Sequence, residues 1–247
     1  PTTDPYNNTT ALFSDCNSLA TCPFFVQVQT AAQLGLALNK GDGTVGLNDN
    51  VTRQEMARLV VLSMMDENAV TAYLNSTGGC TTSFADVAPG CAGGQPVASV
   101  TNTSGVANFW RYIETMRRKK ITTGCFVNDA IANFCPTALL TRGQMAVFLV
   151  RAKFSNVYPS VISGCPTPQA PACPGIAGGD NFGLTVGTTP YFSDVTATNA
   201  FFVYIQKMYE LRITNGVNPV PGAAAYGDLQ NLTRGQLLTF IIRSFFF

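Results

Sequence analysis

The chain has 247 residues, enough to bury a sizeable core, and 46% of them are hydrophobic whereas only 12% are charged. The charged share is about half of the roughly 25% typical of soluble domains, so the surface either contacts neighbouring molecules extensively or is covered by Thr, Asn and Ser. A net charge of +1 gives no reason to expect nucleic acid or an anionic membrane as a partner, and no apolar run approaches the roughly 20 residues of a membrane span.

Residues 1–11 have the polar, proline-containing composition of an extended N-terminal arm. The chain begins at Pro1 rather than at Met, and no apolar signal sequence follows. We therefore expect a mature, exported product from which the signal sequence has been removed.

Three later segments repeat one order of features: segment 1 (12–75), segment 2 (76–162) and segment 3 (191–247). Each opens with Phe, one further residue and Asp, and we expect this Asp to cap or tie the first turn. An apolar stretch of helical periodicity follows and predicts a first helix in each segment. The openings are Phe13/Asp15, Phe84/Asp86 and Phe192/Asp194, and the helices begin near Phe24–Phe25, Phe109–Trp110 and Phe201–Phe202.

A glycine turn, a short loop and a second helix complete each segment. We expect the turn glycines to end the first helix through a left-handed residue. The second helix begins with Thr-Arg-x-Glu/Gln, the pattern of a capping box in which the two side chains satisfy unpaired amides reciprocally. The glycines are Gly43, Gly124 and Gly216, the apolar loop residues are Val45, Phe134 and Tyr226, and the boxes are Thr52/Glu55, Thr141/Gln144 and Thr233/Gln236.

Two loop-like stretches rich in Gly, Pro and Cys interrupt this order, an insertion at 89–106 and a connector at 163–190. Eight cysteines permit 105 pairings, but four local disulfides are the simplest, and they fit an oxidising compartment. Zinc is the rival, yet the usual C-x-x-C spacing and histidine partners are absent, so we predict disulfides and no metal or other cofactor. The sequential pairs are Cys16/Cys22, Cys80/Cys91, Cys125/Cys135 and Cys165/Cys173.

Taken together, these motifs resemble the S-layer homology domain, in the family's usual number of three and over nearly the whole chain. The chain departs from the family pattern Thr-Arg-Ala-Glu, because it has Thr-Arg-Gln-Glu once and Thr-Arg-Gly-Gln twice. The resemblance implies a mainly α fold, in which three helix-loop-helix repeats pack with pseudo-threefold symmetry around a central helical bundle, with disulfide-pinned loop insertions.

The resemblance also makes Arg53, Arg142, Arg234 and Trp110 candidates for binding a cell-wall polysaccharide. In the family the matching arginine contacts the polymer, and a guanidinium group suits an acidic sugar substituent. The alternative is that each arginine, at the first position of its helix, braces the neighbouring segment through a carbonyl or carboxylate group.

We do not expect an enzyme. The chain has no histidine, the commonest general base, and its cysteines are expected in disulfides. No phosphate-binding glycine motif is present. A glycosidase with two carboxylates stays open, because carboxylates far apart in the chain can meet in space.

Two functions are expected, and the first is ranked ahead. The first is a secreted bacterial surface protein that associates with copies of itself into a layer, sheath or fibre. Its low charge and apolar ends favour subunit contacts, for which the candidates are Pro1, Tyr6, Phe245, Phe246 and Phe247. The second is a cell-wall polysaccharide-binding anchor that holds a protein on the cell surface. It ranks second because the repeats fill the chain and leave no passenger domain.

Overall fold

The computed structural model describes residues 11–37, 40–92, 95–96, 106–128, 131–155, 184, 186–217 and 224–247. This part of the chain is mainly helical, as the sequence predicts, with two short antiparallel hairpins. No helix within it is long and apolar enough to cross a membrane. The predicted contacts of Pro1 and Tyr6 and the predicted bridge between Cys165 and Cys173 lie outside the described residues.

Each segment contains the two predicted helices, and further elements appear between them. Helix α3 was not predicted; the side chain of Asp66 caps it by accepting a hydrogen bond from the Ala69 amide at 2.8 Å. Segment 1 contains α1 (Phe25–Gln33), α2 (Arg53–Leu62) and α3 (Glu67–Ser76). Segment 2 contains β1 (Cys91–Ala92), β2 (Gln95–Pro96), α4 (Val106–Arg118), β3 (Phe126–Asn128), β4 (Ile131–Asn133) and α5 (Arg142–Phe154), and segment 3 contains α7 (Phe202–Glu210) and α8 (Arg234–Phe245).

The three predicted capping boxes are confirmed at the starts of α2, α5 and α8. In the first, the Glu55 carboxylate accepts a hydrogen bond from the Thr52 amide at 2.8 Å, and the Thr52 hydroxyl accepts one from the Glu55 amide at 3.4 Å. The same exchange joins Thr141 to Gln144 and Thr233 to Gln236. The sequence therefore fixes the start of each second helix through contacts three residues apart.

The first helices end differently from the prediction. The left-handed residues that follow α1, α4 and α7 are Gly35, Lys120 and Arg212, with φ of 69°, 59° and 59°. The expected glycines lie further on and serve another purpose: a Cβ at Gly124 would lie 2.5 Å from a backbone carbonyl oxygen, and one at Gly216 would lie 2.3 Å from another. These glycines allow two stretches of backbone to approach each other, whereas a left-handed residue nearer the helix ends it.

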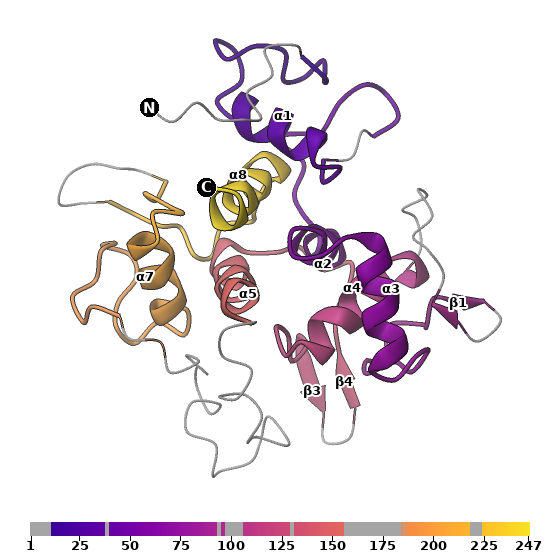
Figure 1. Ribbon diagram of the computed structural model, residues 1–247. Helices are drawn as coiled ribbons and strands as arrows, with labels where there is room; N and C mark the ends of the chain where they lie inside the picture. The colour runs from indigo at the N-terminus through magenta and orange to yellow at the C-terminus, as the bar shows by residue number, and fades with distance from the viewer. Residues whose placement is uncertain are drawn as a thin grey trace.

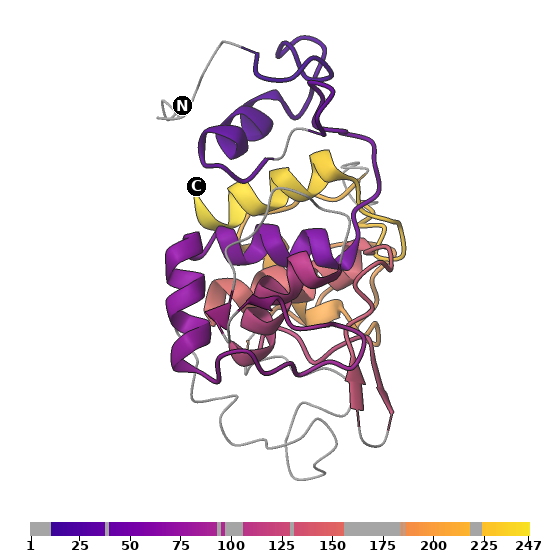
Figure 2. The same ribbon diagram turned by 90° about the vertical axis from the view of Figure 1, so that its right-hand side faces the viewer.

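Helices α2, α5 and α8 lie side by side and contact one another, with α1, α4 and α7 on their outer sides (Figure 1, Figure 2). Each second helix packs against the first helix of the following segment: α2 against α4, α5 against α7, and α8 against α1. One hydrophobic core runs through all three segments. Its largest fully buried side chains include Trp110, Tyr112, Tyr204, Tyr226, Phe84, Phe134 and Phe192.

Three of the four predicted disulfides lie within the described residues, and all three are confirmed. They join Cys16 to Cys22, Cys80 to Cys91, and Cys125 to Cys135. The second connects the turn after α3 to strand β1 at the start of the insertion. The insertion is therefore pinned by a local bridge at its N-terminal end.

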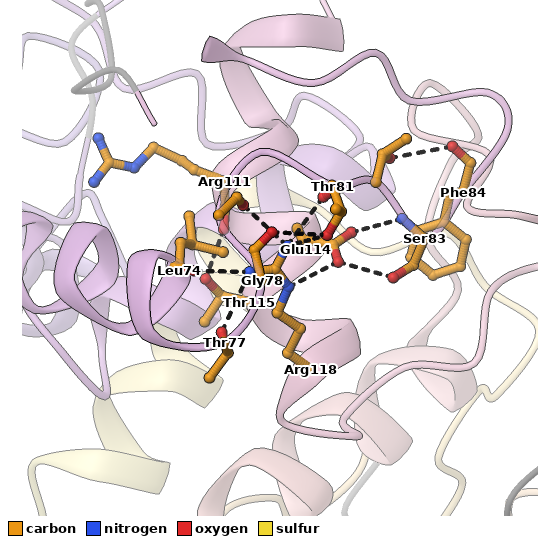
Figure 3. Close-up of polar contacts among 12 residues, drawn as sticks. Leu74, Thr77, Gly78, Thr81, Ser83, Phe84, Arg111, Glu114, Thr115 and Arg118 are labelled. Atoms are coloured by element: carbon orange, nitrogen blue, oxygen red, sulfur yellow. Dashed lines mark hydrogen bonds and ion pairs between the residues drawn. The ribbon is translucent and has the colours of Figure 1, made fainter. Parts of the chain in front are cut away.

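A polar network next to this disulfide joins α3, the turn that follows it, and α4 (Figure 3). The buried Glu114 carboxylate accepts hydrogen bonds from the Ser83 amide at 2.9 Å and from Arg118 Nε at 2.9 Å. Arg118 also donates to the carbonyl groups of Leu74, Gly79 and Thr81 at 2.9, 3.1 and 3.0 Å. The Leu74 contact joins segment 2 to segment 1, and the others hold the turn after α3 against α4.

Candidate functional site

The N-terminal ends of α2, α5 and α8 meet loops of neighbouring segments, and the candidate arginines lie at this junction. The first amides of a helix have no partner within the helix. Here the amides of Arg53, Arg142 and Arg234 donate to carbonyl groups of the next segment at 3.0, 2.9 and 3.0 Å. The acceptors are Ala138, Gln230 and Asp49, so the contacts run from segment 1 to 2, from 2 to 3, and from 3 back to 1.

The residues just before these helices form a closed circuit of backbone hydrogen bonds. The Val51 amide donates to the Leu232 carbonyl at 2.9 Å, the Leu232 amide to Leu140 at 2.8 Å, and the Leu140 amide to Val51 at 2.9 Å. All three side chains are buried. One residue from each segment therefore contributes to a shared contact that no segment can form alone.

The side chains of Arg53 and Arg142 are buried at this junction, with exposed fractions of 4% and 2%. Arg53 Nε donates to the Phe134 carbonyl and Arg142 Nε to the Tyr226 carbonyl, both at 2.8 Å. Each guanidinium also lies over the ring of that same residue at 4.8 Å, a favourable cation–π geometry. Burial lowers the pKa of Arg53 to about 10 and also lowers the pKa of Arg142.

The aspartates at matching positions of the three segments bind the loops that meet the N-terminal ends of the second helices. Asp86 accepts hydrogen bonds from the amides of Phe134 and Cys135 at 2.8 and 2.7 Å, and Asp194 accepts from those of Tyr226 and Gly227 at 2.8 and 2.7 Å. In segment 1 the same role falls to Asp15, which accepts from Val45 and Gly46 at 2.9 Å each. The expectation that these carboxylates cap the first turn is therefore corrected: they hold a loop 30 or more residues further along the chain.

Arg234 differs from the other two arginines because its side chain is 17% exposed. Its Nη1 pairs at 3.1 Å with the Glu55 carboxylate, which is 31% exposed and belongs to the one capping box that keeps the family's Glu. The pair lies where segment 3 meets segment 1. Arg234 is thus the candidate arginine that solvent reaches best, while Arg53 and Arg142 have the bracing contacts of the alternative interpretation.

Trp110 and the C-terminal phenylalanines are the remaining candidates. Trp110 is fully buried in the core, which argues against direct contact with a polymer. Phe245 is the last residue of α8, and Phe246 and Phe247 follow it. Phe245 and Phe246 pack partly buried against the core, and the Phe247 side chain is 59% exposed.

In two segments glycine stands where the family motif has alanine, and the structure gives a steric explanation for both. A Cβ at Gly143 would lie 2.4 Å from a ring carbon of Phe201, and one at Gly235 would lie 2.7 Å from a ring carbon of Phe24. These rings begin the first helix of the neighbouring segment. Glycine at this position therefore admits an aromatic ring across the junction.

Sequence reasoning missed a hollow of about 570 Å³ in segment 3. It lies away from the junction, between the C-terminal end of α7 and the last turn of α8. Its residues are spread over more than 50 positions and share no local motif, so spacing alone gives no signal for it. The lining consists of Tyr191, Tyr209, Glu210, Arg212, Asn215 and Arg243.

Comparison with known proteins points to one family. No curated protein matches the chain significantly. Residues 27–57 match the model of the S-layer homology domain, and they run from α1 into α2 and include the Thr52–Glu55 capping box. This part of the chain is therefore similar to the S-layer homology domain, the family that the sequence motifs resemble, which suggests a protein of the cell surface.

Proposed function

We propose that this chain is a non-enzymatic bacterial surface protein that binds a cell-wall polysaccharide through modules of the S-layer homology type. The observation that carries the proposal is the family match at residues 27–57. The three local disulfides fit an extracellular location, because such bridges persist in oxidising compartments. The absence of histidine from the sequence favours binding over catalysis.

The proposal includes three modules related by pseudo-threefold symmetry around a bundle of α2, α5 and α8. The matched stretch comprises a first helix, a loop and the start of a capped second helix, and the same elements recur twice. Supporting contacts follow the same cycle in each segment: the amide at the first helical position donates to the next segment, and an aspartate holds the receiving loop. Two helices per module cannot bury their apolar faces alone, so the modules are expected to depend on one another.

The test is co-sedimentation of the purified chain with cell walls of the bacterium that produces it. We expect the chain to sediment with intact walls and to stay in solution with peptidoglycan that has been freed of its attached polysaccharide. Albumin serves as the control for trapping in the pellet. Equal sedimentation with both preparations, or with neither, contradicts the proposal.

Self-association into a layer, sheath or fibre is a second candidate. Its supporting observation is a set of exposed apolar side chains, among them Leu229, Leu19 and Phe247 at 78%, 69% and 59% exposure. Exposed apolar groups on a weakly charged protein favour contacts between copies. Sedimentation velocity over a hundredfold range of protein concentration tests this candidate. A sedimentation coefficient that stays at the value of a monomer would exclude self-association, and one that rises with concentration would support it.

A further inference from the structure

The hollow in segment 3 has a wall that a buried glutamine holds in place. Gln206 of α7 is fully buried, and its Oε1 accepts a hydrogen bond from the Tyr191 amide at 3.0 Å. Its Nε2 donates to the carbonyl groups of Gly187 and Thr189 at 3.1 and 2.8 Å. The backbone that carries Tyr191 is therefore fixed against α7 before any ligand arrives, and such preorganisation lowers the entropic cost of binding.

Two exposed tyrosines form one side of the hollow. The rings of Tyr191 and Tyr209 stack with centroids 4.3 Å apart and an interplanar angle of 25°. The Tyr209 ring also packs edge to face with the buried Phe192 ring, with ring centroids 5.5 Å apart. This contact with the core restrains the Tyr209 side chain. Nevertheless the two tyrosines are 42% and 39% exposed, so the stacked pair presents a rigid aromatic surface to solvent.

Charged and amide groups complete the lining. Arg212 is exposed, and its side chain has no hydrogen-bond or ion-pair partner among the residues that the structure describes. Arg243 Nη1 donates to the Ile213 carbonyl at 3.3 Å. The Glu210 carboxylate is already engaged, since it accepts from the Gly187 amide at 3.1 Å and pairs with Lys207 at 2.5 Å. The available charge in the hollow is therefore positive.

The backbone at Arg212 places a cationic side chain at the edge of the hollow, as the equivalent left-handed residue after α4 is Lys120. Arg212 adopts a left-handed conformation (φ 59°) at the position where Gly35 ends the first helix of segment 1. An arginine there costs about 1 kcal/mol relative to glycine.

We infer that this hollow binds an acidic sugar unit of the cell-wall polysaccharide, an inference that rests on the proposed function. The apolar C–H face of a pyranose ring fits the flat tyrosine surface, because an aromatic face excludes water from it and attracts its weakly positive hydrogens. Arg212 and Arg243 supply charge-assisted donors for a carboxylate. Asn215 offers an amide for a sugar hydroxyl group.

Neither of the other two segments has this pair of tyrosines, since the residues of segment 1 that correspond in order to Tyr191 and Tyr209 are Leu12 and Ala32. In segment 2 the residues that correspond in order to Tyr191 and Tyr209 are Ser83 and Arg117, and Ser83 is already bound to the Glu114 carboxylate. We therefore expect one acidic-sugar site per chain rather than three.

The experiment is titration calorimetry of the full chain with polysaccharide released from the producer's cell wall. The same polymer with its carboxyl groups chemically reduced to alcohols serves as a neutral counterpart. We expect wild type to bind the intact polymer at least about tenfold more tightly than the reduced one, the loss expected for one charge-assisted contact. Arg212→Gln should remove that difference, and Tyr191→Ala should weaken binding to both polymers about tenfold. Tyr73→Ala and Arg117→Gln, which change a tyrosine and an arginine outside the hollow, should bind like wild type.

The outcomes separate this inference from the proposed function. If wild type binds neither polymer, the proposed function fails and the inference fails with it. If wild type binds and the two hollow variants bind equally well, the inference alone is overturned. If wild type binds both polymers equally while Tyr191→Ala weakens both, the acidic character of the sugar is overturned. Circular dichroism melting of every variant shows whether a weakened variant is still folded.

Discussion

At the scale of single residues, Arg142 and Arg234 occupy the same motif position but different environments. Arg142→Ala should lower the free energy of unfolding by about 2–4 kcal/mol, because it leaves a cavity between aromatic rings and a buried carbonyl without its donor. Arg234→Ala should cost less than about 1 kcal/mol, since it removes a partly exposed ion pair. Urea unfolding measures both, and equal costs would contradict the distinction between bracing and exposed arginines.

Tyr226 links the same junction to alkaline stability. Its hydroxyl donates to the Arg142 carbonyl at 3.0 Å, and full burial raises its pKa well above the usual value near 10. Because the folded chain holds the neutral phenol, the stability it contributes is present below about pH 10 and is lost as the pH rises toward the folded pKa. Tyr226→Phe should cost about 1 kcal/mol at pH 7 and make the decline of stability above pH 10 shallower. Tyr191→Phe removes the hydroxyl group of an exposed ring; it is the control and should leave the free energy of unfolding at pH 7 unchanged.

At the scale of elements, the start of α5 depends on a glycine that faces an aromatic ring. Gly143→Ala places a methyl group 2.4 Å from a ring carbon of Phe201 and should lower the free energy of unfolding by about 1–3 kcal/mol through overpacking. Gln54 holds the corresponding position of α2, where a side chain is already accommodated. Gln54→Ala should therefore lower the free energy of unfolding clearly less than Gly143→Ala does, as measured by thermal or urea unfolding. A Gly143→Ala variant as stable as wild type would refute the steric explanation of the motif change.

The predicted fourth disulfide joins two cysteines of the connector between the second and third segments. The three confirmed bridges all join cysteines 6 to 11 residues apart, and Cys165 and Cys173 have a similar separation. We expect a local bridge there that contributes roughly 2–3 kcal/mol in the chain-entropy model. Peptide mapping under non-reducing conditions should recover a peptide pair containing both cysteines. Free thiols at these positions, or a bridge between chains, would contradict the prediction.

At the scale of the whole molecule, the C-terminal phenylalanines separate folding from association. Phe246 packs against the core, so Phe246→Ser should cost about 1–3 kcal/mol of stability. Phe247 is 59% exposed, so Phe247→Ser should change stability by less than about 0.5 kcal/mol. If the chain self-associates through this end, Phe247→Ser should lower the sedimentation coefficient at high concentration while leaving unfolding unchanged. Association equal to that of wild type would exclude Phe247 as a contact.

The local elements were the most predictable part of this protein. The capping boxes at Thr52, Thr141 and Thr233 rely on contacts three residues apart, and the confirmed disulfides on cysteines close in sequence. Helix α3 was missed because its signal, the Asp66 cap, follows directly on α2 and belongs to no repeated motif. The left-handed ends at Lys120 and Arg212 were missed because glycine, not a long cationic residue, is the usual sign of such an end.

The sequence by itself determined where the second helices begin, which cysteines pair within the described chain, and which family residues 27–57 resemble. Only the tertiary structure decided what the motif residues contact. It buried Arg53 and Arg142 between aromatic rings, left Arg234 partly exposed, and brought Tyr191, Tyr209 and Arg243 to one hollow. The physical reason is the separation in sequence of the residues in contact. A helix cap or a short disulfide loop joins residues that are close along the chain, whereas the burial of a side chain depends on segments that meet only after folding.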